Sequence, residues 1–122
     1  MKKNILIVED DQFFRDLLKK KLSSLGYNII EAPNGEKGIE LAKEKKPDLI
    51  ILDLLLPNID GFEVLSKVRT NSETSSTPVI IVSNLGQQED VERGLKLGAT
   101  DYLIKSQFDI ESITSKIRNI LK

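Results

Sequence analysis

Five short runs of aliphatic and β-branched residues alternate along this chain with five segments whose apolar residues recur at helical spacing. The runs cover residues 5–8, 27–31, 49–52, 79–82 and 102–104. Most are continuous instead of alternating with polar residues, which is typical of strands buried on both faces. This pattern predicts an α/β fold of three layers, a doubly wound parallel sheet with helices on both faces.

The helical segments are defined by apolar stripes and by residues that end helices. The first stripe is Phe14, Leu18, Leu22 and Leu25, and Gly26 is placed to end that helix. The middle helices are expected at about residues 35–45, 61–71 and 88–97, and in the last of these Val91 and Leu95 share one face. An isoleucine stripe marks the final helix: Ile110, Ile113, Ile117 and Ile120. Antiparallel pairing would need hairpin signals, and no two strands are close enough in sequence for one.

Composition removes several classes of function. The 122 residues carry no cysteine and no histidine, which excludes disulfides, thiol catalysis, the Ser-His-Asp arrangement and the usual zinc ligands. The net charge of −1 gives no broad positive footprint, so direct nucleic-acid binding is not expected. Any chemistry must come from carboxylates, lysines and hydroxyls.

Length and hydropathy suggest one domain over residues 1–122. Neither a signal peptide nor a run approaching the ~18–20 apolar residues of a membrane span is present, so we expect a soluble, cytoplasmic chain without membrane insertion. We also expect a stand-alone domain, since no output domain follows the last helix; a domain excised from a larger protein would look the same.

Polar residues follow four of the five predicted strands, at the edge where open α/β sheets bind ligands. They are Glu9 and Asp10 after the first strand, Asp53 after the third, Ser83 and Asn84 after the fourth, and Lys105 after the fifth. Taken singly, most could be ordinary surface or strand-end residues. Asp53 is different because it interrupts "LIILDLLL", where a carboxylate without a partner would be costly. Asp11 directly precedes the first helix and is expected to be its N-cap.

This set of side chains suits phosphoryl transfer. Carboxylate oxygens are ligands that Mg²⁺ prefers, and an aspartate beside the metal can attack phosphorus to form an acyl phosphate. Lys105 would offset the charge of the transferred group, and Ser83 could donate a hydrogen bond to it. No phosphate-binding loop of the form GxxxxGK[ST] occurs, so a phosphoryl donor must come from outside.

The motifs resemble those of the response regulator receiver domains (CheY-like) of two-component signal transduction. The segments that match are "ILIVEDD", "PDLIILDLLLPNIDGFEVL", "TPVIIVSN" and "GATDYLIKS", in this order across essentially the whole chain. The resemblance implies a flavodoxin-like strand order of 2-1-3-4-5. It also implies a switch that is no enzyme toward other substrates and catalyses only its own phosphorylation and dephosphorylation.

The resemblance further implies specific roles. Asp53 would accept a phosphoryl group from the phosphohistidine of a sensor histidine kinase or phosphotransfer protein. Mg²⁺ would be held by Glu9, Asp10, Asp53 and the backbone carbonyl of Leu55. Lys105 and Ser83 would contact the phosphoryl group, and Tyr102 would turn inward as Ser83 moves. The face formed by the fourth helix, fifth strand and fifth helix would then be recognised by a downstream effector protein.

Pro57 and Gly61 match the loop that follows the acceptor in this family. A fixed φ at the proline and a flexible φ at the glycine would suit a tight turn there.

Three positions depart from the common pattern of the family. Ser83 replaces the more usual threonine and keeps the hydroxyl. Asn84 stands where alanine or glycine is usual, so it could restrict access to Asp53 or hydrogen-bond the phosphoryl group. Ser106 replaces a proline whose preceding bond is typically cis; we expect either a trans bond with a slightly shifted Lys105 or a strained cis bond.

Other functions remain open at this stage. One is an interaction module that keeps the fold and works without phosphorylation, a degenerate receiver. Another is an aspartate-dependent phosphatase, which usually needs a second carboxylate near the nucleophile, whereas Leu55 lies two residues after Asp53. A flavin carrier is disfavoured because no phosphate-binding loop follows the first strand.

Overall fold

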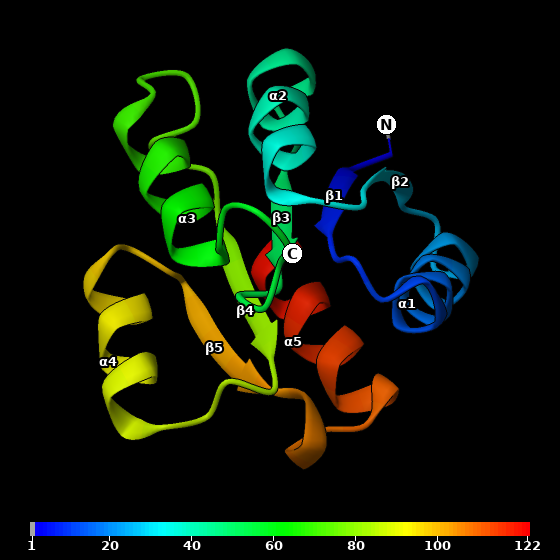
Figure 1. The fold of residues 1–122 in the computed structure, drawn as a ribbon. Coiled ribbons are helices and arrows are strands. Elements are labelled where there is room, and N and C mark those ends of the chain that lie inside the picture. The colour runs from blue at the N-terminus through cyan, green and yellow to red at the C-terminus, as the bar shows by residue number, and fades with distance from the viewer. Residues whose placement is uncertain (1) are drawn as a thin grey trace.

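A parallel five-stranded sheet forms the centre of the molecule (Figure 1). The computed structural model describes residues 2–122. The strands lie in the order β2-β1-β3-β4-β5 and span β1 Asn4–Val8, β2 Asn28–Ala32, β3 Leu49–Leu52, β4 Val79–Ser83 and β5 Asp101–Ile104. All four neighbouring pairs are parallel. The predicted fold class and strand order are therefore confirmed, and each predicted strand boundary lies within one residue of the observed one.

Five α-helices connect and cover the strands: α1 Gln12–Ser24, α2 Gly35–Lys45, α3 Gly61–Thr70, α4 Gln88–Lys96 and α5 Ile110–Leu121. A 3-10 turn, η1 Lys105–Gln107, precedes α5 and was not predicted. Four of the α-helices begin after a side chain that accepts hydrogen bonds from the first turn: Asp11, Asn34, Asp60 and Asp109. The predicted N-cap role of Asp11 is confirmed, and Gly26 follows α1 with a φ of 96°. Across residues 2–122, none of these helices has the length and apolar character needed to cross a membrane.

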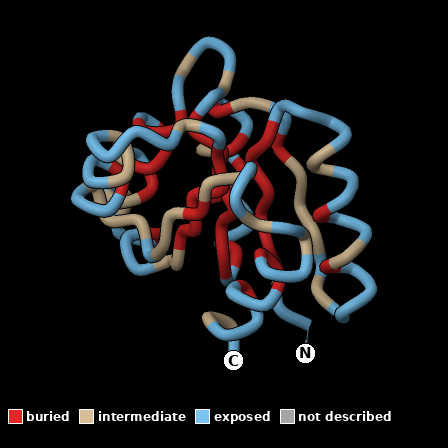
Figure 2. Tube along the Cα trace, turned by 90° about the horizontal axis from the view of Figure 1, so that it is seen from below, coloured by how far each residue is buried: buried red, intermediate tan, exposed pale blue. Residues whose placement is uncertain are grey.

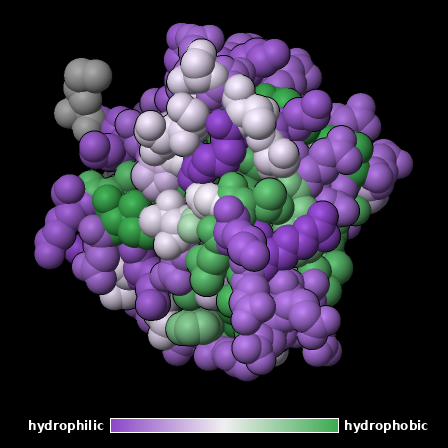
Figure 3. All heavy atoms as spheres, turned by 90° about the vertical axis from the view of Figure 1, so that its left-hand side faces the viewer, coloured by the Kyte–Doolittle hydropathy of each residue, from purple (hydrophilic) through white to green (hydrophobic). Residues whose placement is uncertain are grey.

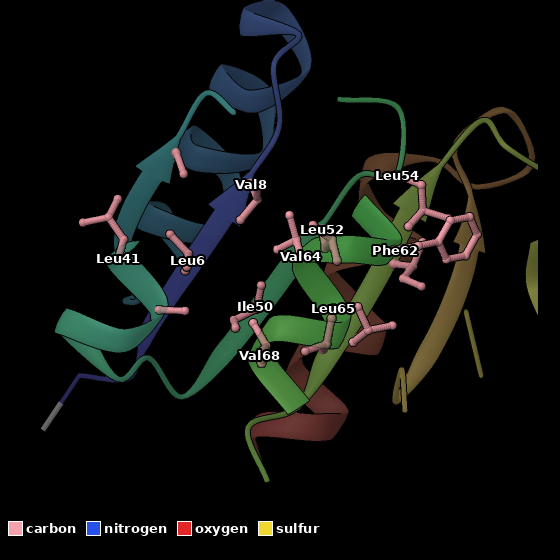
Figure 4. Close-up of a cluster of buried hydrophobic side chains, with 14 residues drawn as sticks. Leu6, Val8, Leu41, Ile50, Leu52, Leu54, Phe62, Val64, Leu65 and Val68 are labelled. Atoms are coloured by element: carbon pink, nitrogen blue, oxygen red, sulfur yellow. The ribbon is translucent and has the colours of Figure 1, made fainter. Parts of the chain in front are cut away.

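The core lies on both faces of the sheet. Alternate residues of β1 point to opposite sides: Leu6 and Val8 pack with α2 and α3, and Ile5 and Ile7 pack with α1 and α5. Figure 4 shows the first of these clusters, in which strand side chains meet those of α2 and α3. In Figure 2 the buried residues follow the sheet and the inner sides of the helices. The three-layer prediction holds because nearly every residue of the inner strands β1, β3 and β4 is buried, whereas the edge strands β2 and β5 are mostly half-buried.

Helix α4 packs on the sheet through a glycine. A Cβ atom at Gly94 would lie 2.8 Å from Cδ1 of Ile81 and 3.0 Å from Cδ2 of Tyr102, so any larger residue would require these side chains to shift. The face predicted from Val91 and Leu95 is consequently not a buried stripe: Val91 is half-buried and Leu95 is 47% exposed. Figure 3, which views the molecule from the side that is left in Figure 1, shows a mostly hydrophilic surface interrupted by small apolar patches.

The loop after Asp53 is built differently from the sequence-based expectation. A flexible φ was expected at Gly61, but its φ is not positive; the left-handed residue of this loop is Asn58, with φ 67°. Gly61 is required by proximity instead. A Cβ atom there would lie 2.4 Å from the backbone oxygen of Asp53 and 2.5 Å from Cα of Leu54. The prediction was thus correct about the residue and wrong about the reason.

Replacing Gly61 by alanine is expected to lower the free energy of unfolding by about 1–3 kcal/mol, because backbone atoms must move to make room. Urea denaturation would measure this. Gly86→Ala is a suitable control, because the atom nearest to its new Cβ is Cδ1 of the Ile104 side chain, at 3.1 Å. Equal stability of the two variants would contradict the close-approach explanation.

Candidate functional site

Each polar residue predicted at a strand end lies at the carboxyl edge of the sheet. Val8 pairs with Leu52 in the ladder between β1 and β3, so Glu9 and Asp53 leave the sheet side by side. The backbone N–H of Asp53 also donates to the carbonyl of Val8, at 3.0 Å. Since β4 and β5 end at the same edge, Ser83 and Lys105 complete the site.

Lys105 is the centre of the charge arrangement. Its Nζ lies 2.6 Å from Oε1 of Glu9 and 2.9 Å from Oδ2 of Asp53. The three side chains are only 13%, 3% and 5% exposed, respectively. Two buried carboxylates thus share one ammonium group, which offsets part of the cost of removing all three charges from water.

Phe14 and Arg15 of α1, which were not predicted as site residues, also contact the site. Nζ of Lys105 lies 4.5 Å from the centre of the Phe14 ring, within the range of a cation–π interaction. Arg15 donates through Nη1 to the carbonyl of Glu9, at 2.7 Å, and through Nε to Glu31. Phe14 was expected only to pack in the core. The position of Phe14 in the first turn of α1, directly after the acidic residues, was the sequence feature that could have indicated a contact with the site.

Glu9, Asp10 and Asp53 form the acidic group expected of a metal site. Each offers an oxygen, and these atoms all lie within 4.8 Å of one another. Glu9 and Asp53 are buried and Asp10 is exposed, so one side of the group is open to water, as Mg²⁺ requires for the waters it retains. These hard oxygen donors fit that ion. The backbone N–H of Leu55 donates to Oδ1 of Asp53, at 3.1 Å, while a ligand role for its carbonyl stays a prediction.

Burial and proximity shift the proton affinities of the site. Burial raises the pKa of Glu9 to about 7, although its hydrogen bond to Lys105 acts in the opposite direction. Burial would lower the pKa of Lys105, but hydrogen bonds to Glu9 and Asp53 leave that pKa raised. The lysine is therefore charged at neutral pH, and Glu9 sits near the midpoint of its titration.

Two hydrogen bonds hold Leu85, in the loop after β4. Ser83 is fully buried, and its Oγ accepts from the backbone N–H of Leu85 at 3.3 Å. The hydroxyl of Tyr102 donates to the carbonyl of Leu85. Tyr102 is half-buried beside Gly94, and burial, with the charges of Asp90 and Asp53, raises its pKa to about 12. The phenol therefore stays protonated and remains a donor.

The family comparison agrees with this geometry. The family model described as the response regulator receiver domain matches residues 5–118. The chain belongs to this family. Its receiver domain has Lys105 in contact with buried Glu9 and Asp53, and exposed Asp10 completes the acidic group.

Known relatives resemble this receiver domain over almost its full length. The DNA-binding dual master transcriptional regulator RpaA of Synechocystis sp. is 42% identical over 118 residues, which are 97% of this chain and 48% of the relative. The chain thus spans about half the length of the curated relatives that it matches.

Solved structures share the fold. A putative response regulator from Chloroflexus aurantiacus has a TM-score of 0.91 at 31% identity, covering 99% of this chain and 98% of that one. The BeF3-activated N-terminal receiver domain of RstA from Klebsiella pneumoniae has a TM-score of 0.88 at 26% identity, covering 98% of each chain.

Two of the departures from the family pattern contact each other in this receiver domain. No cis peptide bond occurs among residues 2–122, so the bond before Ser106 is trans, one of the two predicted outcomes. The backbone N–H of Ser106 donates to Oδ1 of Asn84, at 3.2 Å. This contact between residues 22 positions apart was not predicted from the sequence.

The metal-free receiver domain is expected to lose stability as the pH rises from about 4.5 to about 7. In this range folded Glu9 keeps its proton, whereas in the unfolded chain Glu9 has its ordinary pKa of 4.5 and releases the proton. Because the unfolded state then binds fewer protons, the free energy of unfolding falls with pH, by up to about 3 kcal/mol. Urea titrations in EDTA at several pH values would measure it. A Glu9→Gln variant should flatten this dependence, and an unchanged slope would contradict the assignment.

Proposed function

We propose that this receiver domain is a phosphorylation-dependent switch in which Asp53 accepts a phosphoryl group. The observation that carries the proposal is the position of its buried carboxylate, hydrogen-bonded to Lys105 and grouped with Glu9 and Asp10. A buried aspartate in contact with other acids and only one ammonium is a costly arrangement for stability alone. It suits a site that must receive a group carrying further negative charge, together with a cation.

In the proposed reaction an oxygen of Asp53 forms a bond to phosphorus while the bond between phosphorus and the donor breaks. The donor group leaves with that electron pair; for a phosphohistidine it is the imidazole of a histidine kinase or phosphotransfer protein. Mg²⁺, held by Glu9, Asp10 and Asp53, would offset charge on the transferred group. Lys105 orients and neutralises the phosphoryl oxygens, and Ser83 donates its hydroxyl to one of them.

Phosphorylation would change the surface formed by the loop after β4 and by β5. Oγ of Ser83 accepts the N–H of Leu85 and can still donate its own O–H to a phosphoryl oxygen, so a shift of Ser83 toward that group would be passed to Leu85, whose carbonyl accepts from Tyr102. Movement of this loop therefore reaches Tyr102, and through Gly94 the packing of α4. An effector protein that recognises α4, β5 and α5 would sense the change.

Output to DNA is proposed only through other parts of a longer protein. The relative RpaA is named as a DNA-binding regulator, and it is about twice the length of the matched region. The net charge of −1 offers no basis for nucleic-acid binding by these residues themselves. We propose no enzymatic activity toward other substrates, because the residue two positions after the nucleophile is Leu55 and supplies no general acid.

Incubation with acetyl phosphate, followed by intact-mass measurement, tests the proposal. With Mg²⁺ the protein should gain one phosphoryl group, and with EDTA in its place the gain should be absent or much slower. A protein that gains nothing in either condition, and does not bind beryllofluoride with Mg²⁺, would be an interaction module that works without phosphorylation.

A further inference from the structure

Asn84 and Ser106 connect the two loops that carry the phosphoryl-binding side chains. Asn84 follows Ser83 directly, and Ser106 follows Lys105 directly. Oδ1 of Asn84 accepts the backbone N–H of Ser106, at 3.2 Å. A proline at position 106 would have no N–H to donate, so this bond needs the side-chain acceptor of Asn84 and a residue other than proline at position 106.

The bond extends the connection between β4 and β5 beyond the end of the sheet. The last pair of that ladder is Ser83 with Ile104, and the two chains then separate into loops. Lys105 thus lies between two fixed points, the ladder at Ile104 and the Asn84 bond at Ser106. Both ends of its backbone are held while its side chain reaches Glu9 and Asp53.

We propose that Asn84 is a positioning residue for phosphoryl transfer, which acts by tying the Lys105 loop to the loop after β4. The proposal rests on the function proposed above and adds a part of the site specific to this chain. Without the tie, the ammonium group would spend less time at the oxygens of Asp53. The bond joins exposed groups, so its removal is expected to change rates by about two- to tenfold.

A different role for Asn84 would produce the opposite result. If its bulk merely restricted entry of the donor, a smaller residue would speed the reaction. Asn84→Ala removes both the bulk and the amide, whereas Asn84→Leu keeps similar bulk and removes the amide with its acceptor oxygen. Asn84→Asp retains an acceptor oxygen, and Gln87→Ala is the control, an exposed side chain of the same loop that makes no capping bond.

The test measures phosphorylation rates over a range of acetyl phosphate concentrations with Mg²⁺, and exchange of the Ser106 amide proton by NMR without any donor. We expect Asn84→Ala and Asn84→Leu both to lower the maximal rate by about two- to tenfold and to speed Ser106 exchange by a similar factor. The donor concentration for half-maximal rate should stay unchanged. Asn84→Asp should keep the slow exchange, and Gln87→Ala should match the unsubstituted protein in both measurements.

Faster phosphorylation of Asn84→Ala but not of Asn84→Leu would overturn the proposal in favour of a steric gate. Unchanged Ser106 exchange in both variants would overturn it as well. These results differ from failure of the function itself, in which the unsubstituted protein takes up no phosphoryl group and the positioning role falls with it.

Discussion

An Asp53→Asn variant is expected to gain no phosphoryl group under conditions in which the unsubstituted protein gains one. The amide that replaces the carboxylate has nearly the same shape but is not a nucleophile toward phosphorus. Glu9 is not expected to replace it, because its carboxylate is paired with the Lys105 ammonium at 2.6 Å. Intact-mass measurement after incubation with acetyl phosphate and Mg²⁺ gives the result directly.

Asp48→Asn is the matched control for this experiment. Asp48 directly precedes β3, at the opposite edge of the sheet, where its carboxylate accepts the backbone N–H of Asn4. The same chemical change at that edge should leave phosphorylation unaffected. Full phosphorylation of Asp53→Asn would place the acceptor elsewhere and contradict the proposed function.

A Lys105→Met variant should unfold at lower urea concentration than the unsubstituted protein. Methionine keeps most of the side-chain length and can still contact Phe14, but it leaves Glu9 and Asp53 buried without their cation. Removing one partner from a buried ionic group costs about 3–5 kcal/mol, because the charges that stay behind are uncompensated. The loss should be greatest above pH 7, where Glu9 is ionised.

Two comparisons separate this effect from a general loss of charge. Lys116→Met removes a lysine that is 47% exposed and 3.6 Å from Asp101, and it should change stability by no more than about 0.5 kcal/mol. Millimolar Mg²⁺ should restore part of the stability of Lys105→Met, because the cation can bind between the unpaired carboxylates. If both lysine variants were equally stable, the central role of Lys105 would be refuted.

The fold could be predicted because its determinants are local in sequence. Continuous apolar runs predict strands buried on both faces, and strands of that kind bring their carboxyl ends to one edge. The residues of the site could be predicted in the same way. Asp53 interrupts an apolar run, and Glu9 and Lys105 directly follow two other apolar runs. Their contacts at 2.6 and 2.9 Å confirm that these side chains converge.

Features that depend on distances between elements could not be predicted in this way. Gly61 lies close to the backbone of the loop after Asp53, and Gly94 lies where α4 closely approaches the sheet. No local sequence pattern distinguishes these two glycines from glycines in turns. The bond between Asn84 and Ser106 joins residues 22 positions apart. In the sequence each of them is only a separate departure from the family pattern, so their contact could not be predicted. Val91 and Leu95 were predicted to share one face of α4, but Leu95 is exposed, because the helix packs closest to the sheet at Gly94.

The most direct measurement is to locate the acyl phosphate on the unsubstituted protein. Borohydride reduction of the phosphorylated chain converts an aspartyl phosphate to homoserine, and peptide mass spectrometry then identifies the modified residue. We expect homoserine at position 53 and nowhere else, and only when Mg²⁺ and acetyl phosphate were both present. Homoserine at position 10, or a stable phosphoryl group on a hydroxyl such as that of Ser83, would contradict the assignment of Asp53 as the acceptor.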